Sequence, residues 1–157
     1  MHELKRITGA GVTAALQKAE RYRLLNEPSA AESICLDVLA VDPDNQQALV
    51  QLALARTDQF TSELSGGVER AREPLARVRD DYRRAYYLGI VCERRGKAQL
   101  RSQSPGGHAI AYDWLRRAMD LYEQAEQLRP PGNDEALLRW NTCARVMDRH
   151  HLTAPEP

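Results

Sequence analysis

The spacing of apolar residues divides the chain into runs that each predict an α-helix. Between residues 13 and 45, apolar positions three to four residues apart lie on both sides of a break at Asn26, Glu27 and Pro28. This spacing places apolar side chains on one face of a helix, and a proline interrupts such a run. The segment therefore predicts two short helices folded back on each other. A single pair cannot bury all of its apolar surface, so we expect further helices beside it.

Two short patterns predict where these first helices begin. Thr13 precedes an apolar run at 14–25, and its side chain can accept a hydrogen bond from the first turn. Ser29, with Glu32 three residues later, has the form of a capping box for a second helix that ends near Val41. We expect residues 1–12 to form a flexible leader ahead of this pair.

A second pair is predicted at 46–80, and it is less regular than the first. An apolar run begins at Ala48, and residues 68–78 again have the spacing of a helix. Between these runs, the segment from Asp58 to Gly67 contains a glycine pair and predicts an inserted loop. Pro74 removes one backbone hydrogen bond, so we expect it to kink the second helix or to shift its start.

The third unit predicts a longer helical hairpin. Residues 81–103 and 108–129 both keep helical spacing, and Pro105, Gly106 and Gly107 interrupt it between them. The tip of such a hairpin extends beyond the shorter pairs. Four apolar side chains near this tip either pack on one another or contact a partner, which includes a second copy of the chain: Leu100, Ile110, Tyr112 and Trp114.

A last helix is predicted at 134–150. It has one apolar face and one charged face, which is the pattern expected of the helix that closes a helical array. The residues after it, 152–157, include two prolines and are expected to be disordered.

Small and aromatic residues recur at fixed places in the first and third units. In the first unit, Ala19 and Ala31 are small where two helices would cross, and Tyr22 fills the space beside them. Pro43 stops the second helix. These positions resemble the tetratricopeptide repeat family, in the form of a small bacterial domain. The third unit matches the pattern again at three positions and has a glycine where the family turns: Ala85, Leu88, Gly89 and Gly96.

The resemblance implies an all-α fold in which antiparallel helix pairs stack into a right-handed superhelical array. It implies about three repeats, at 13–45, 46–80 and 81–130, followed by the capping helix at 134–150. Together they would form a single helical domain at 13–151, with an extended third hairpin.

In the family that this chain resembles, the first helix of each repeat lines a concave surface that binds a partner protein or peptide. Transferred to matching positions, the resemblance implies nine partner-binding residues: Arg23, Val50, Leu54, Arg83, Tyr86, Ile90, Arg94, Leu138 and Arg145. The alternative for Val50, Leu54, Ile90 and Leu138 is burial under a neighbouring helix. The Lys and Asn residues with which some relatives bind a terminal carboxylate are not present at the matching positions.

Composition favours a helical protein with a continuous core. Of the 157 residues, 43% are hydrophobic, and runs of β-branched residues are few, so strands are not expected. The mean hydropathy of −0.57 argues against a membrane protein. Cys35, Cys92 and Cys143 lie far apart on apolar helical faces and are expected to be reduced core residues of a cytoplasmic protein.

Charge is unevenly distributed although the formal net charge is zero. Residues 68–101 hold ten basic and five acidic residues, and 19 of the 22 basic residues in the chain are arginine. One interpretation is a solvated helix surface with ion pairs. The other is RNA binding, with three tyrosines available for base stacking: Tyr82, Tyr86 and Tyr87. The neutral net charge argues against nucleic acid as the main partner.

No catalytic, metal or cofactor site is predicted. Cys143 and His150 can share a helix face, but they lack the third and fourth ligands that a zinc site needs. Glycine-rich phosphate loops and nucleophile motifs are missing. We therefore expect a non-catalytic interaction module, that is, an adaptor, an assembly factor or a subunit of a complex that binds another protein or peptide, with RNA binding as the alternative.

Overall fold

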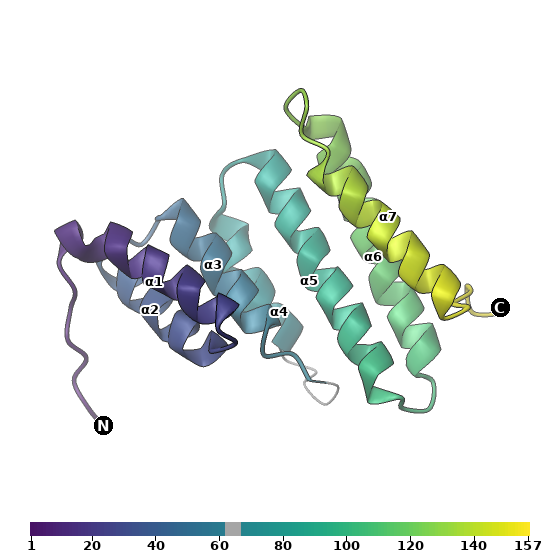
Figure 1. The fold of residues 1–157 in the computed structure, drawn as a ribbon, viewed down its shortest axis with the longest axis horizontal. Helices are drawn as coiled ribbons and strands as arrows, with labels where there is room; N and C mark the ends of the chain where they lie inside the picture. The colour runs from purple at the N-terminus through teal and green to yellow at the C-terminus, as the bar shows by residue number, and fades with distance from the viewer. Residues whose placement is uncertain (62–66) are drawn as a thin grey trace.

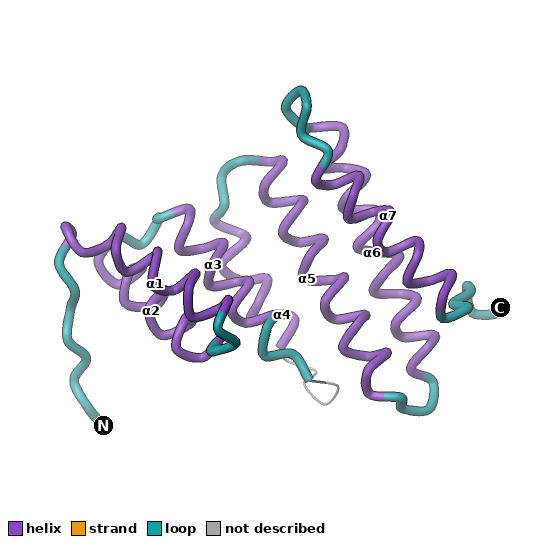
Figure 2. The backbone as a smooth tube through the Cα atoms, in the orientation of Figure 1, coloured by secondary structure: helices purple, strands orange, loops and turns teal. Residues whose placement is uncertain are grey.

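The computed structural model describes residues 1–61 and 67–157, and all regular secondary structure in this part of the chain is helical (Figures 1 and 2). The all-α prediction is confirmed, and none of the described helices combines the length and apolarity needed to cross a bilayer. The described elements are two short 3₁₀ helices, η1 (Gly9–Gly11) and η2 (Glu73–Arg77), and seven α-helices: α1 (Val12–Leu24), α2 (Pro28–Val41), α3 (Gln46–Thr57), α4 (Gly67–Arg72), α5 (Asp81–Ser102), α6 (Gly107–Leu128) and α7 (Glu135–Arg149).

Each helix packs on the next one along the chain. The pairs α1 with α2, α2 with α3, α5 with α6 and α6 with α7 make the most extensive contacts, and α3 packs on α4 and η2. The helix α3 also contacts α1 and α5. In Figure 1, α1 lies in front of α2, and α5 and α7 run in the same direction with α6 behind α7. The helices α5 and α7 therefore share one face of the molecule.

The first two helices begin at residues other than those predicted. Thr8, and not Thr13, has the capping role, because its hydroxyl accepts a hydrogen bond from the Gly11 backbone at 3.1 Å and opens η1. Pro28 is the first residue of α2 and needs no partner for its missing N–H. Ser29 thus lies inside the helix, and its side chain caps nothing.

Pro74 ends an α-helix, in agreement with the predicted disturbance. The helix α4 stops at Arg72, and the chain continues through buried Pro74 as the 3₁₀ helix η2. Proline has no N–H and clashes with the preceding turn of an α-helix, which explains the change. The loop predicted at 58–67 falls partly outside the described residues, at 62–66, and α4 begins at Gly67.

The hairpin of α5 and α6 is close-packed along its length. Each helix has 22 residues, close to the predicted ranges. A Cβ atom at Gly89 would lie 2.6 Å from Cε1 of Tyr122, and one at Gly96 would lie 2.9 Å from Cγ of Leu115. Gly96 therefore lies inside α5 and permits close contact with α6, whereas the family pattern implied a turn there.

The core follows the order of the helices. Buried residues of α5, α6 and α7 form the largest cluster, and smaller clusters join α1 to α2 and α3, and α3 to α4, η2 and α5. Cys35, Cys92 and Cys143 are buried and form no disulfide, as expected of reduced core residues. Burial raises the pKa of the Cys35 thiol to about 11, so this thiol stays protonated at neutral pH.

Candidate functional site

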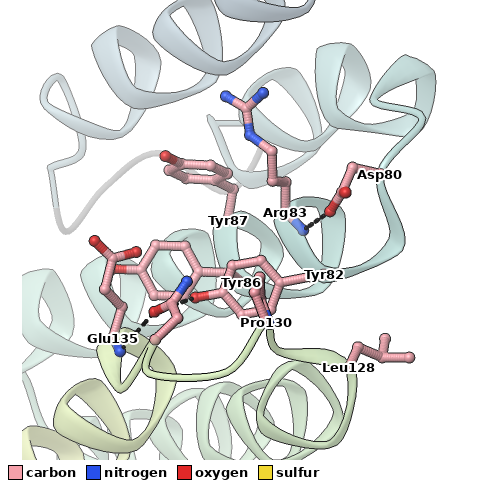
Figure 3. Close-up of a pocket in the computed structure, with 9 residues that line it drawn as sticks. Asp80, Tyr82, Arg83, Tyr86, Tyr87, Leu128, Pro130 and Glu135 are labelled. Carbon is pink, nitrogen blue, oxygen red and sulfur yellow. Dashed lines mark hydrogen bonds between the residues drawn. The ribbon is translucent and has the colours of Figure 1, made fainter.

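A row of depressions lies along the face shared by α5 and α7. The first, here called the tyrosine pocket, has a volume of about 340 Å³ and lies where the α6–α7 connection passes the start of α5 (Figure 3). It is lined by Asp80, Tyr82, Arg83, Tyr86, Tyr87, Leu128, Pro130, Asn133 and Glu135.

The three tyrosines of this pocket hold one another in place. The rings of Tyr82 and Tyr86 stack with centroids 5.9 Å apart, and Tyr87 meets Tyr86 edge-on at 5.1 Å. The Tyr82 hydroxyl donates to Oδ1 of Asn133 at 3.3 Å, which joins α5 to the loop before α7. Burial raises the pKa of Tyr82. The pocket wall is therefore formed by rings that already contact protein on at least one side.

A smaller depression continues the row towards the middle of α7. Its volume is about 210 Å³, and it shares Tyr86 and Glu135 with the tyrosine pocket. Leu138, which is 61% exposed, Arg139 and Thr142 complete its lining. An apolar side chain thus remains accessible at the centre of the face.

Below this depression, a buried carboxylate joins α5, α6 and α7. The Glu93 side chain is 1% exposed and accepts hydrogen bonds from Lys97 Nζ at 2.6 Å, the Tyr122 hydroxyl at 2.8 Å and Arg139 Nη1 at 3.3 Å. Burial alone would raise the pKa of Glu93, but the hydrogen bonds and charges of Lys97, Tyr122 and Arg139 bring it below its usual value. Glu93 is therefore ionised and fixes the relative position of the three helices.

The row ends in two depressions around the last turns of α5. The one on the α1 and α3 side, here called the cationic pocket, has a volume of about 280 Å³. It is lined by Arg23, Asn26, Thr57, Asp58, Arg94, Lys97 and Arg101. The one on the α7 side, here called the apolar slot, has a volume of about 300 Å³ and is lined by Lys97, Leu100, Arg101, Val146 and His150.

Two arginines of the cationic pocket converge on one carboxylate. Asp58 accepts from Arg23 Nε at 2.7 Å and from Arg94 Nη1 at 2.7 Å, and Arg94 also donates to the Thr57 hydroxyl at 2.8 Å. Burial and the charges of Arg23 and Arg139 lower the pKa of Arg94, against the opposite effect of Asp58. One carboxylate thus orients two cations from helices that are distant in the sequence.

Five of the nine predicted partner-binding residues line this row of depressions. Arg23 and Arg94 line the cationic pocket, Arg83 and Tyr86 line the tyrosine pocket, and Leu138 lines the depression between them. The structure therefore brings residues predicted on three different helices, α1, α5 and α7, to one face.

The other four predicted residues lie elsewhere. Val50 and Ile90 are only 4% and 3% exposed and belong to the core, which corrects their assignment to a binding surface. Both are apolar residues at positions that a neighbouring helix covers. Leu54 is partly buried against two core clusters, and Arg145 is exposed on α7 outside the depressions described above.

Lys97 and Arg101 line the site but were not predicted as site residues. They follow Arg94 at intervals of three and four residues, so all three share one face of α5. This spacing was visible, but the expected turn at Gly96 ended the family pattern before it. Val146 and His150 lie four residues apart at the end of α7 and also line the site. They were not predicted, because the sequence pattern does not indicate which helix packs beside them.

The hairpin tip mostly packs on the protein itself. Trp114 lies against the guanidinium groups of Arg72 and Arg117, 5.4 and 4.9 Å from its ring centroid. Leu100, Tyr112 and Trp114 contact the core cluster of the hairpin, whereas Ile110 is 43% exposed. Self-association through the tip stays a prediction.

No protein-family model matches the chain, and no curated protein matches it significantly.

Proposed function

We propose that this protein is a non-catalytic interaction module, built like a tetratricopeptide repeat array, that holds a segment of a partner protein along the face shared by α5 and α7. The observation that supports the proposal most is the row of depressions on this face, which the helices leave open from the tyrosine pocket to the cationic pocket and the apolar slot. Clefts of this kind between neighbouring helices commonly accept short peptide segments.

The dimensions of this face suit a short segment. Tyr82 and Arg101 are the outermost residues of α5 in its lining, and their positions along the helix are about 28 Å apart at 1.5 Å per residue. An extended peptide covers this distance with about nine residues. The buried Glu93 bonds hold α5 and α7 in place before any ligand arrives, so less conformational entropy is lost on binding.

RNA binding by the basic stripe has less support. Six of its ten basic residues make ion pairs with carboxylates of this chain: Arg70, Arg72, Arg79, Arg84, Arg94 and Lys97. The tyrosines considered for base stacking contact one another, and Tyr86 is buried. We therefore advance a protein segment as the partner.

Selection from a displayed library of random twelve-residue peptides tests the proposal. Peptides enriched on the wild-type protein are then measured by fluorescence anisotropy against Leu138→Glu and, as a control, against Leu36→Glu on α2. Both leucines are exposed, Leu138 at 61% and Leu36 at 47%, so neither change should disturb the core. We expect Leu138→Glu to weaken binding at least tenfold, since it places a charge in the middle of the site, and Leu36→Glu to change it less than twofold.

Two results would contradict the proposal. If no peptide is enriched on the wild-type protein, the chain does not bind protein segments in this way. If the enriched peptides bind both variants equally, they use another surface. Circular dichroism of each variant establishes that the helices are retained.

A further inference from the structure

We propose that the end of this face around the last turns of α5 recognises an acidic residue that has an apolar residue close to it in the partner segment. This inference rests on the proposed function and specifies the chemistry of the ligand. The cationic pocket would hold the carboxylate, and the apolar slot would hold the apolar side chain. The two depressions share Lys97 and Arg101, so one short segment can occupy both.

Charge supports an acidic ligand. The side chains that line the cationic pocket, together with Glu93, which pairs with Lys97, and Arg139, which pairs with Glu93, include five cations and two carboxylates, an excess of three positive charges. The cations are Arg23, Arg94, Lys97, Arg101 and Arg139, and the carboxylates are Asp58 and Glu93. Because both carboxylates are already shared between cations, an additional carboxylate would be attracted to this region.

The arginines keep hydrogen-bond donors available for a ligand. A guanidinium group has five N–H donors. Arg94 directs Nη1 at Thr57 and Asp58, and Arg23 directs Nε and Nη2 at Asp58, which leaves further donors on each group. Asp58 thus acts as a positioning residue that fixes two cations at the pocket wall. Arg101 is exposed and makes no ion pair within the described part of the chain.

The apolar slot favours a peptide over a small anion as the ligand. Leu100 and Val146 form its apolar walls between α5 and α7. Neighbouring helices are about 10 Å apart, so the two depressions are separated by about three residues of an extended chain. The lining of the apolar slot contains no Phe, Tyr or Trp ring on which a nucleic-acid base could stack. A carboxylate and an aliphatic side chain within three residues of each other satisfy both depressions.

The peptide selection described above tests the inference directly. We expect enriched peptides to contain Asp or Glu within three residues of Leu, Ile, Val or Met. Replacing that acid by its amide should weaken binding at least tenfold, and raising the salt concentration should weaken it as well.

Charge reversal in the protein identifies the site. Arg101→Glu replaces an exposed cation by an anion, so it should lower the affinity of the enriched peptides at least tenfold. Arg77→Glu is the matched control, because Arg77 is also exposed and lies in η2 outside the depressions. It should change binding less than twofold. A peptide in which lysine replaces the acid should regain affinity for the Arg101→Glu variant.

The outcomes separate this inference from the proposed function. Enriched peptides that lose affinity for Leu138→Glu but not for Arg101→Glu would retain the binding face and refute acidic recognition. Enriched peptides without acidic residues would refute it too, and the absence of any enriched peptide would refute both. A twelve-residue oligouridine that binds more tightly than the best peptide, and is lost in Arg101→Glu, would show that the cations serve RNA.

Discussion

The first four helices and the last three bury their polar groups in different ways. Between α1 and α4 the helices have at most 14 residues, and the carboxylate that joins them, Glu32, stays at the edge, where its side chain is 14% exposed and binds Arg56 at 2.7 Å. Between α5 and α7 the hairpin helices have 22 residues, and the joining carboxylate, Glu93, is inside. The comparison teaches that a buried carboxylate, which is costly to desolvate, joins the helices of the second region and also fixes the geometry of the binding face.

The largest expected effect comes from neutralising the buried carboxylate. Glu93→Gln keeps the shape of the side chain but leaves Lys97 and Arg139 without their counterion, and it should lower the free energy of unfolding by about 3 kcal/mol. Glu32→Gln is the matched change in the first region and should lower it by about 1 kcal/mol, because that carboxylate is nearer to solvent. Urea unfolding at pH 7 measures both. Equal losses would show that the two regions do not differ in this respect.

A smaller effect on stability is expected from adding a side chain at the close contact between α5 and α6. Gly89→Ala adds a Cβ that would lie 2.6 Å from the Tyr122 ring, so the ring or the helix must move. We expect Gly89→Ala to lower the free energy of unfolding, measured by thermal unfolding, by about 2 kcal/mol. Gly9, in η1, is the control, because an added Cβ has nothing within 4 Å there. A neutral or stabilising Gly89→Ala would mean that the hairpin is packed more loosely than described.

The smallest expected effect is a loss of stability at acidic pH. The pKa of Glu93 and that of Glu32 are both lowered by folding, so each carboxylate stabilises the folded state above its unfolded pKa of about 4.3. This contribution is lost as the pH falls through the lower folded value. Between pH 5 and pH 3 the wild-type protein should therefore lose more stability than Glu93→Gln. Parallel curves from urea unfolding at several pH values would contradict the assignment of a charged Glu93.

Local patterns predicted the helices better than they predicted the surface of each helix. The hairpin predicted at 81–103 and 108–129 is found as α5 and α6, because apolar spacing and the Pro-Gly-Gly break act within one segment. The helix expected at 134–150 is found as α7. Pairing of distant helices is not contained in such spacing, so it did not decide between the surface that the family positions implied for Val50 and Ile90 and the burial that is found.

Only part of the candidate site was predicted, because the packing of distant helices also determines which of its residues come together. Arg23 and Arg94 were named separately from their repeat positions, but their convergence on Asp58 depends on how α1, α3 and α5 pack. The family pattern implied a turn at Gly96, whereas in the structure the absence of a side chain there lets Leu115 approach. Lys97 and Arg101 lie within the helix predicted at 81–103, but beyond the family positions from which binding residues were transferred.

The bonds of Glu93 also constrain how α7 docks during folding. Three of its partners, Lys97, Tyr122 and Arg139, lie 4, 29 and 46 residues away, so these bonds require, respectively, α5 alone, the hairpin of α5 and α6, and a docked α7. A slip of α7 by one helical turn would move Arg139 by about 5.4 Å and break its bond to Glu93. The carboxylate thus selects one register of α7 against α5, and with it the alignment of every depression between them.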